Sequence, residues 1–218
     1  MTELVRRSSW LRLGFVAATA SLLTLLATSF VDARGFIPRP GEVRMNIAAP
    51  AAQPDPMLAA GVAFGSNVSL YFSSGIGPSA SNSAAPGGTP ERYIDTAQFP
   101  GGTLPDGVTI TEAQGMNAMQ RIVENLDSQG LTVADITSMR IYLEAPPGAD
   151  RADYNGWNRA YRRYLANIDR VTGEVRPQYE PVVIANATRP SRTNLEVATL
   201  PVQGWLVEIE VVAAYTRG

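Results

Sequence analysis

Hydrophobic and polar residues alternate along two stretches near the C-terminus, residues 192–201 and 205–214. In the second stretch the apolar side chains share one face, and Glu208 and Glu210 share the other. A period of two residues is typical of a strand with one face in a core. The turn residues 201–204 between the stretches predict a hairpin, with Arg192 at the mouth of its first strand.

The same alternation predicts strands earlier in the chain. Residues 59–65 and 68–74 are separated by the turn-forming Gly65, Ser66 and Asn67, so a second hairpin is expected there. A further strand is predicted over 135–143.

A spacing of three and four residues between apolar side chains predicts two helices. The first follows the capping-box pattern Thr111–Gln114 and ends near Gly130, which is a suitable C-cap. The second is expected over 152–165, with aromatic residues on one side and arginines on the other. Two helices interspersed among strands and hairpins predict an α+β fold, in which both helices pack on one mixed sheet.

The N-terminus has the pattern of a secretory signal. Arginines precede an apolar run over 13–27, and small residues follow it. We expect a signal peptide over 1–33, cleaved after Ser29 or Ala33, and an exported protein that is periplasmic or secreted. The alternative is an uncleaved membrane anchor, although the apolar run is shorter than the roughly 20 residues of a spanning helix.

Three regions of the remaining chain lack clear periodicity. Residues 34–57 are rich in proline and alanine and are predicted to form a flexible linker, so that the domain covers 58–218. Within the domain, the segment from about 79 to 109 is rich in Ser, Ala, Pro and Gly, and the segment 167–189 shows no regular hydrophobic pattern. Segments of this length without secondary structure are generally functional or mobile.

Composition removes several kinds of chemistry. The chain has 218 residues and no histidine or cysteine, and all 18 basic residues are arginine. These absences exclude Ser-His and Cys-His nucleophiles, histidine or thiolate zinc sites and a Schiff-base lysine. The net charge of −2 argues against a nucleic-acid partner, which needs a concentrated basic surface.

Several motifs resemble the RidA/YjgF (Rid) family of small imine deaminases. The C-terminal signature is Arg192-x-x-x-Glu-Val-Ala-x-Leu-Pro201 followed by Val207-Glu-Ile-Glu-x-x-Ala213. Earlier motifs occur in matching order: Gly61–Gly65, Ser74–Pro78, Ala113-Gln114, Gly130–Ile136, and Asp153–Asn158 with Tyr161. The resemblance extends from about Leu58 to the end. Compared with the usual length of family members, residues 79–109 and 167–189 are insertions.

The resemblance implies a chorismate-mutase-like fold and a homotrimer with clefts between subunits. It also implies hydrolysis of imines or enamines of small amino acids to 2-keto acids and ammonia, as in a 2-iminobutanoate/2-iminopropanoate deaminase, without a metal or cofactor. Arg192 then binds the substrate carboxylate, since a guanidinium donates two parallel hydrogen bonds. Glu208 orients or deprotonates the attacking water, and Ser74 and Asn194 add polar contacts for binding a carboxylate-bearing imine or keto acid.

Other roles stay open for these residues. Arg192 can instead form a structural ion pair with Glu208 or Glu196, and Glu210 can replace Glu208. Asn158 and Gln114 match family positions but are expected to cap or brace the backbone.

The sequence also departs from the family at three cleft positions, where it has Leu58, Ile76 and Asn194 in place of the usual tyrosine, glutamine and cysteine. The alternative function is a non-catalytic trimer that binds carboxylate metabolites. A third function, ribonuclease activity, is disfavoured by the acidic charge and the absence of histidine. Membrane contact is expected only through an uncleaved signal segment.

Overall fold

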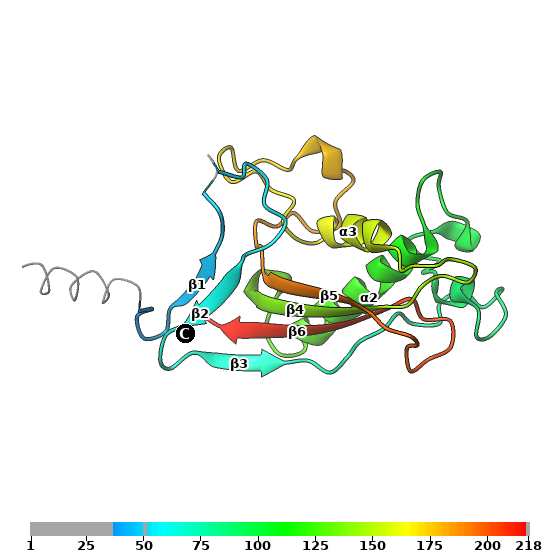
Figure 1. Ribbon diagram of the computed structural model, residues 1–218, viewed down its shortest axis with the longest axis horizontal. Helices are drawn as coiled ribbons and strands as arrows, with labels where there is room; N and C mark the ends of the chain where they lie inside the picture. Colours follow the sequence, from blue (N-terminus) through cyan, green and yellow to red (C-terminus); the bar gives the residue numbers. More distant parts are fainter. Residues whose placement is uncertain (1–36, 50–51, 217–218) are drawn as a thin grey trace, which may run out of the picture.

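The alternating apolar residues line one face of a four-stranded sheet in the computed structural model, which describes residues 37–49 and 52–216. The strand order is β3 (Ser69–Phe72), β6 (Val207–Tyr215), β4 (Ile136–Leu143) and β5 (Ser191–Glu196). β6 runs antiparallel to β3 and β4, whereas β4 and β5 run parallel, so the sheet is mixed (Figure 1).

Helices α2 (Ile110–Asp127) and α3 (Tyr154–Arg162) pack on one face of this sheet and on each other. The predicted α+β fold, with two helices on a mixed sheet, is therefore confirmed. The core between the layers contains Met119, Ile122 and Leu126 of α2, Trp157 and Tyr161 of α3, Met139, Ile141 and Leu143 of β4, and Val207, Ile209 and Val211 of β6.

The start of α2 differs from the sequence prediction by two residues. Thr109, not Thr111, is the N-cap, and its side chain accepts a hydrogen bond from the backbone N–H of Glu112 at 3.2 Å. The Glu112 carboxylate is turned toward Arg159, at 2.6 Å, and does not close a capping box. Gly130 adopts a φ of +70° just beyond the helix, which is the left-handed conformation expected of a residue that ends a helix.

Both predicted hairpins are wrong. β4 lies between β5 and β6, so the two C-terminal strands do not pair with each other. Likewise β3 pairs with β6, while β2 (Gly61–Phe64) pairs with β1 (Val43–Asn46) in a separate two-stranded sheet. Alternation identifies which faces of a strand are buried, but it does not identify the neighbouring strand.

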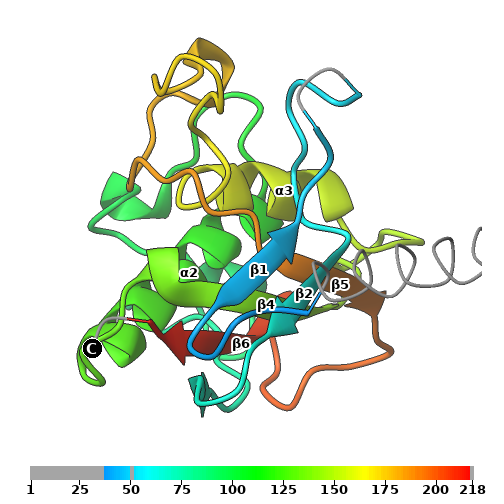
Figure 2. The same ribbon diagram turned by 90° about the vertical axis from the view of Figure 1, so that its left-hand side faces the viewer.

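The region 34–57 is not a flexible linker throughout, because it contains β1 and the buried Pro56. β1 and β2 lie at the end of the main sheet where β6 finishes (Figure 2). The predicted signal peptide over 1–33 lies outside the described residues. Within the described ranges, no helix is both long and apolar enough to span a bilayer.

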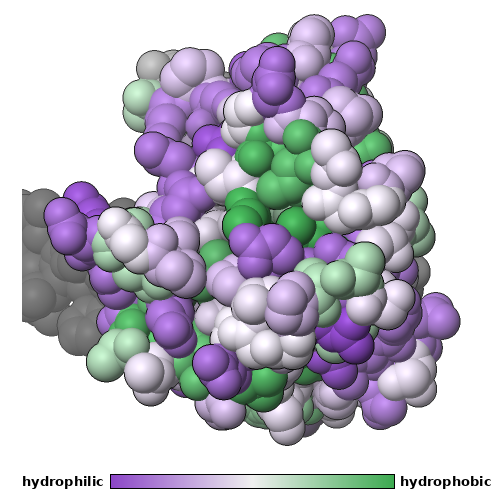
Figure 3. Space-filling view, turned by 90° about the vertical axis from the view of Figure 1, so that its right-hand side faces the viewer, coloured by the Kyte–Doolittle hydropathy of each residue, from purple (hydrophilic) through white to green (hydrophobic). Residues whose placement is uncertain are grey.

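The two segments that sequence analysis treats as insertions pack against the helices. Ile94 and Phe99 of the first segment form a small apolar cluster with Ala113 of α2. Figure 3 views this end of the molecule and shows apolar side chains gathered near the middle of the face. In the second segment the buried Asn167 donates to the carbonyls of Arg162 and Ile184 at 3.0 and 2.8 Å. The inter-element loops therefore extend the core and support α3.

Gln114 gives a direct test of how the loops are held. Its fully buried amide donates to the carbonyls of Pro90 and Gly204, at 2.9 and 2.8 Å, and accepts from the N–H of Leu206 at 2.7 Å. The prediction that Gln114 braces backbone is thus confirmed. Because Gln114→Ala leaves these backbone groups unpaired, we expect a loss of roughly 2–3 kcal/mol of unfolding free energy in denaturant titration.

The matched control is Gln120→Ala on the same helix, which removes only a side-chain hydrogen bond to Glu124 near the surface. We expect it to change stability by less than about 0.5 kcal/mol. Equal effects of the two substitutions would contradict the bracing role of Gln114.

Candidate functional site

Arg192 extends from the edge strand β5 toward α3. Its Cζ lies 4.5 Å from the centroid of the Tyr161 ring, in a cation–π arrangement. One guanidinium nitrogen, Nη2, donates to Asn158 Oδ1 at 2.8 Å and lies 3.2 Å from the sulfur of Met57. The other, Nη1, is buried and has no hydrogen-bond partner among the described residues.

The charge of Arg192 is not balanced by an acidic side chain within residues 37–49 and 52–216. Burial lowers the pKa of Arg192 from its usual value, and the nearby Arg162 lowers it further, although Tyr161 acts in the opposite direction. A guanidinium keeps its proton under such a shift because its ordinary pKa is so high. The cation is therefore partly removed from water and lacks a counter-ion, which favours binding of an anion.

The structure does not support the ion pairs that sequence analysis kept as alternatives for Arg192. Glu196 accepts a hydrogen bond from the backbone N–H of Ala152 at 3.1 Å. Glu210 pairs with Arg140 at 2.9 Å and accepts from the hydroxyl of Tyr142 at 3.3 Å. Glu210 is therefore engaged in a cross-strand network and is a weaker candidate than Glu208 for a role with water.

Asn194 lies on the same face of β5 as Arg192, two residues further along the strand. Arg192 and Asn194 are in register with Met139 and Ile141 of β4, whose side chains are buried under the helices. Asn194 Oδ1 is also buried without a partner among the residues described. The edge strand thus presents an unpaired donor and an unpaired acceptor on one face.

Glu208 lies on the other side of the sheet. Glu208 alternates with the core residues Val207 and Ile209, so its side chain points away from the helices. The carboxylate lies against Gly75, where a Cβ atom would collide with Glu208 Oε1. Ser74, the neighbour of Gly75, is exposed. Burial, and secondarily the charge of Glu210, raise the pKa of Glu208.

The four predicted site residues therefore do not meet within one chain. Arg192 and Asn194 face the helices, whereas Glu208 points to the uncovered face, and Ser74 lies beyond the end of β3, next to the glycine that contacts Glu208. A single described chain does not bring the guanidinium and the Glu208 carboxylate together, and no hydrogen bond or ion pair joins them. Alternation places residues on faces, but sequence analysis assigned all four to one cleft.

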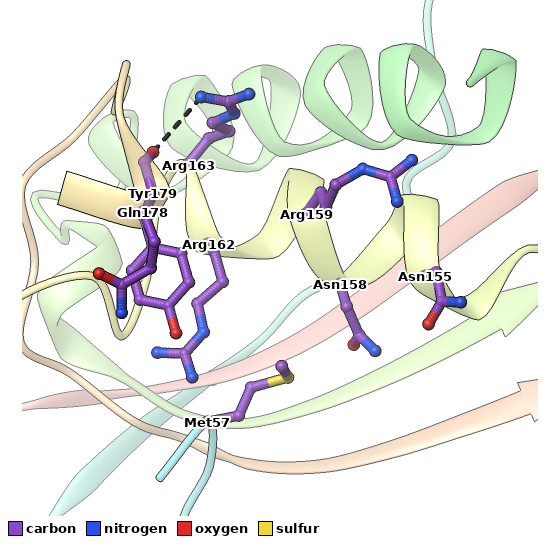
Figure 4. A pocket seen from close by; sticks show the side chains of 8 residues that line it. All are labelled: Met57, Asn155, Asn158, Arg159, Arg162, Arg163, Gln178 and Tyr179. Carbon is purple, nitrogen blue, oxygen red and sulfur yellow. Dashed lines mark hydrogen bonds between the residues drawn. The ribbon is translucent and has the colours of Figure 1, made fainter. Parts of the chain in front are cut away.

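A pocket of about 400 Å³ lies beside Arg192. Met57 and Asn158, which both contact the Arg192 guanidinium, form part of its wall. Figure 4 shows that the remaining lining residues come from α3 and from the segment around η4 (Pro177–Tyr179). The lining residues are Met57, Asn155, Asn158, Arg159, Arg162, Arg163, Gln178 and Tyr179.

Sequence analysis did not identify the residues that hold Arg192 in place. Tyr161 was recognised only as a family match and core residue, and Met57 was assigned to the linker. The Tyr161 hydroxyl donates to the carbonyl of Met57 at 2.9 Å, and burial raises the pKa of Tyr161 to about 12. Sequence analysis expected Asn158 to cap or brace the backbone. In the structure its side chain instead accepts from Arg192 and orients the guanidinium.

Over the described ranges, no three His, Cys, Asp or Glu side chains gather closely enough to hold a metal ion.

Comparison with known families identifies the domain. Residues 101–215, more than half of the chain, match the family model described as Endoribonuclease L-PSP. This chain belongs to the RidA/YjgF family. The matched region contains both helices and the three strands β4, β5 and β6, and therefore Arg192, Asn194 and Glu208. No curated protein matches the chain.

Solved structures of RidA/YjgF proteins are similar over most of the chain at low identity. A Mycobacterium tuberculosis protein, described as a member of the highly conserved YjgF/YER057c/UK114 family, is 21% identical, with 80% of this chain and 100% of that chain covered and a TM-score of 0.38. A YjgF protein from Neisseria meningitidis is 20% identical, with coverages of 81% and 98% and a TM-score of 0.39. E. coli TdcF, solved with bound serine, is 20% identical, with coverages of 82% and 98% and a TM-score of 0.39.

The missing counter-ion of Arg192 can be supplied by mutation. In Asn158→Asp, the atom that accepts from Arg192 Nη2 becomes a carboxylate oxygen, because the two side chains have the same shape. We expect the unfolding free energy at pH 7 to rise by about 1 kcal/mol. In an Arg192→Met background the same substitution should give no increase, and an equal increase there would show that Arg192 is not the partner.

The raised pKa of Glu208 predicts a dependence of stability on pH. The folded state holds the Glu208 proton more tightly than the unfolded state, so this group stabilises the protein at low pH, and the contribution is lost as pH rises through the folded pKa. Glu208→Gln should therefore be slightly more stable than wild type at pH 7, by on the order of 0.5 kcal/mol. The difference should shrink below about pH 4, near the ordinary pKa of glutamate. A difference that grows on acidification, in urea titrations at several pH values, would contradict this account.

Proposed function

We propose that this protein is an exported Rid-type deaminase that hydrolyses imines or enamines of small amino acids to 2-keto acids and ammonia. The observation that carries the proposal is the partly buried Arg192 guanidinium, which has no acidic partner among the described residues and has an unpaired Nη1. A 2-imino acid supplies the missing negative charge through its carboxylate. The family to which the chain belongs supports the reaction class.

In this reaction the main task of the protein is to position the substrate and the attacking water. A protonated C=N bond is electrophilic, so water adds at its carbon while Glu208 accepts a proton from that water. That proton then passes to the nitrogen of the carbinolamine. As the C–N bond breaks, the carbinolamine hydroxyl returns its proton to Glu208, so that ammonia departs and the C=O group of the 2-keto acid forms. The raised pKa of Glu208 brings this carboxylate closer to the basicity that a general base needs near neutral pH.

A second subunit is needed to complete such a site. Arg192 and Glu208 lie on opposite faces of the sheet, so the Glu208 face of one subunit has to meet the Arg192 edge of another. The uncovered face of the sheet supports assembly, because it exposes Phe72 and Leu195 at 68% and 41% of their surface. We propose a homotrimer, with the clefts between subunits as the substrate sites.

The activity is tested by generating imines with an amino-acid oxidase and measuring keto-acid release. Wild-type protein should accelerate the release over the uncatalysed reaction, and Glu208→Gln should retain binding but lose about 100-fold or more in rate. Arg192→Ala should lose both binding and rate. The nearby Glu210→Gln is the matched control, since Glu210 is occupied by Arg140.

Equal rates for wild type, Arg192→Ala and the reaction without enzyme would eliminate catalysis. If 2-keto acids then still bound in an Arg192-dependent manner, the protein would be a non-catalytic carboxylate-binding trimer. Ribonuclease activity, named in the description of the family model, is less compatible with the net charge of −2 and the absence of histidine.

Assembly through the uncovered face predicts the effect of a charge placed on it. Phe72→Glu buries a carboxylate in the proposed interface, so light scattering after size exclusion should detect monomers in place of trimers. Val171→Glu is the matched control, because Val171 is an exposed apolar residue, at 76%, in the irregular segment 167–189. A trimer that survives Phe72→Glu, or a wild-type monomer, would contradict assembly through this face.

A further inference from the structure

The pocket beside Arg192 has features of a binding site in its own right. It lies between α3, Met57 and the segment 178–179, and its volume of about 400 Å³ is in the range of small-molecule sites. Gln178 and Tyr179 belong to the segment 167–189, which sequence analysis treats as an insertion. In Figure 4, Arg162 and Asn158 extend from α3 toward Met57, and Gln178 and Tyr179 form the part of the wall that comes from outside the helix.

Arg162 is the cation of this pocket. The residue is only 4% exposed, and its Cζ lies 4.4 Å from the centroid of the Tyr179 ring. Nη1 interacts with Asp55 at 3.2 Å and with the carbonyl of Ala166. Nη2 makes no hydrogen bond to a described residue, and Nε is buried without one. Arg162 therefore has donor capacity that this chain leaves unused where it is described.

Positive side chains outnumber negative ones around Arg162. Asp55 is shared by Arg162, Arg176 and Arg189, at N–O distances of 3.2, 3.5 and 3.7 Å. Asp169 pairs with Arg176 at 2.7 Å. Three guanidinium groups thus share two carboxylates, and the unpaired Arg192 lies close enough to Arg162 for their charges to interact. Partly buried positive charge in excess favours an anion in the adjoining pocket.

The other arginines of the pocket wall are already engaged. Arg159 donates to Glu112 at 2.6 Å, and Arg163 donates to the carbonyl of Pro181 at 2.7 Å. A second donor is nevertheless present on Asn158, whose Oδ1 accepts from Arg192 while its Nδ2 makes no hydrogen bond to a described residue. Met57 and the ring of Tyr179 supply apolar surface next to these donors.

We propose that this pocket binds a small organic carboxylate with an apolar body. The carboxylate accepts from Arg162 Nη2 and Asn158 Nδ2, which is a charge-assisted arrangement, and the apolar body lies against Met57 and Tyr179. The site lies within one subunit, centred on Arg162, and adjoins the proposed cleft between subunits, since Met57 and Asn158 contact Arg192 as well. It does not depend on deamination.

Binding of benzoate to the full-length protein tests the proposal by calorimetry and ligand-observed NMR. Benzamide is the matched ligand control, since it keeps the ring and removes the charge. Wild-type protein should bind benzoate at least about tenfold more tightly than benzamide. No benzoate binding, or equal binding of the two ligands, would overturn the proposal.

Variants locate the bound benzoate. Gln178→Glu places a carboxylate on the pocket wall at an exposed position and should weaken benzoate binding at least about tenfold, whereas Gln178→Ala should change it less than about threefold. Arg162→Gln should also abolish binding, and Gln178→Glu keeps the test valid if that variant does not fold. Unchanged binding in Gln178→Glu would overturn the proposal.

Arg192→Met separates the two sites. Benzoate binding should weaken less than about tenfold in this variant, because Arg192 does not line the pocket and contributes only by orienting Asn158 and by its charge. If Arg192→Met abolishes binding while Gln178→Glu does not, the ligand occupies the Arg192 cleft. That result would refute the second site and leave the proposed function intact.

Discussion

A guanidinium that is partly withdrawn from water without a carboxylate partner is the interaction on which this account depends. Arg192 rests on the ring of Tyr161 and is oriented by Asn158, and neither neighbour neutralises its charge. The cost of burying a charge is normally offset by pairing, so an unpaired site of this kind suits a protein that receives an anion from outside. The carboxylate common to imino and keto acids fits that requirement.

The surrounding structure holds this cation in place from a segment far away in the sequence. Asp55 interacts with arginines from α3, from the segment 167–189 and from the approach to β5. The fully buried Arg189 additionally donates to the carbonyl of Pro56 at 2.7 Å. These contacts place Met57 directly against Arg192, so the segment 55–57 contributes to the site as well as to the fold.

Much of the fold followed from local patterns, because burial of one face imposes a period of two or 3.6 residues on the sequence. The face assignments in β4 and β6 and the two helices were predicted in this way. Strand pairing was not, since the parallel partner of β5 is β4, which lies some fifty residues earlier in the chain. The strand β1 and the Asp55 cluster were missed for the same reason: their contacts are distant in sequence, and the segment has few apolar residues of regular spacing.

The site was predicted less completely than the fold. Family motifs identified Arg192 and Glu208, but a linear motif does not show that two residues occupy opposite faces of a sheet. Met57 is apolar and therefore did not stand out in the sequence as a site residue. The contacts of Tyr161 and Asn158 with Arg192 depend on the packing of α3 over the edge strand. A structure of the single chain therefore adds a geometric requirement, which is that any reaction using both charged residues involves more than one subunit.

Calorimetric binding of 2-oxobutanoate to wild-type protein and to Arg192→Met tests the central claim most directly, because this ligand has the carboxylate but needs no turnover. The account predicts that one 2-oxobutanoate site of each wild-type subunit loses at least about thirtyfold in affinity in the variant, although the variant is folded. Equal affinity for the two proteins would show that Arg192 does not receive the anion and would contradict the account.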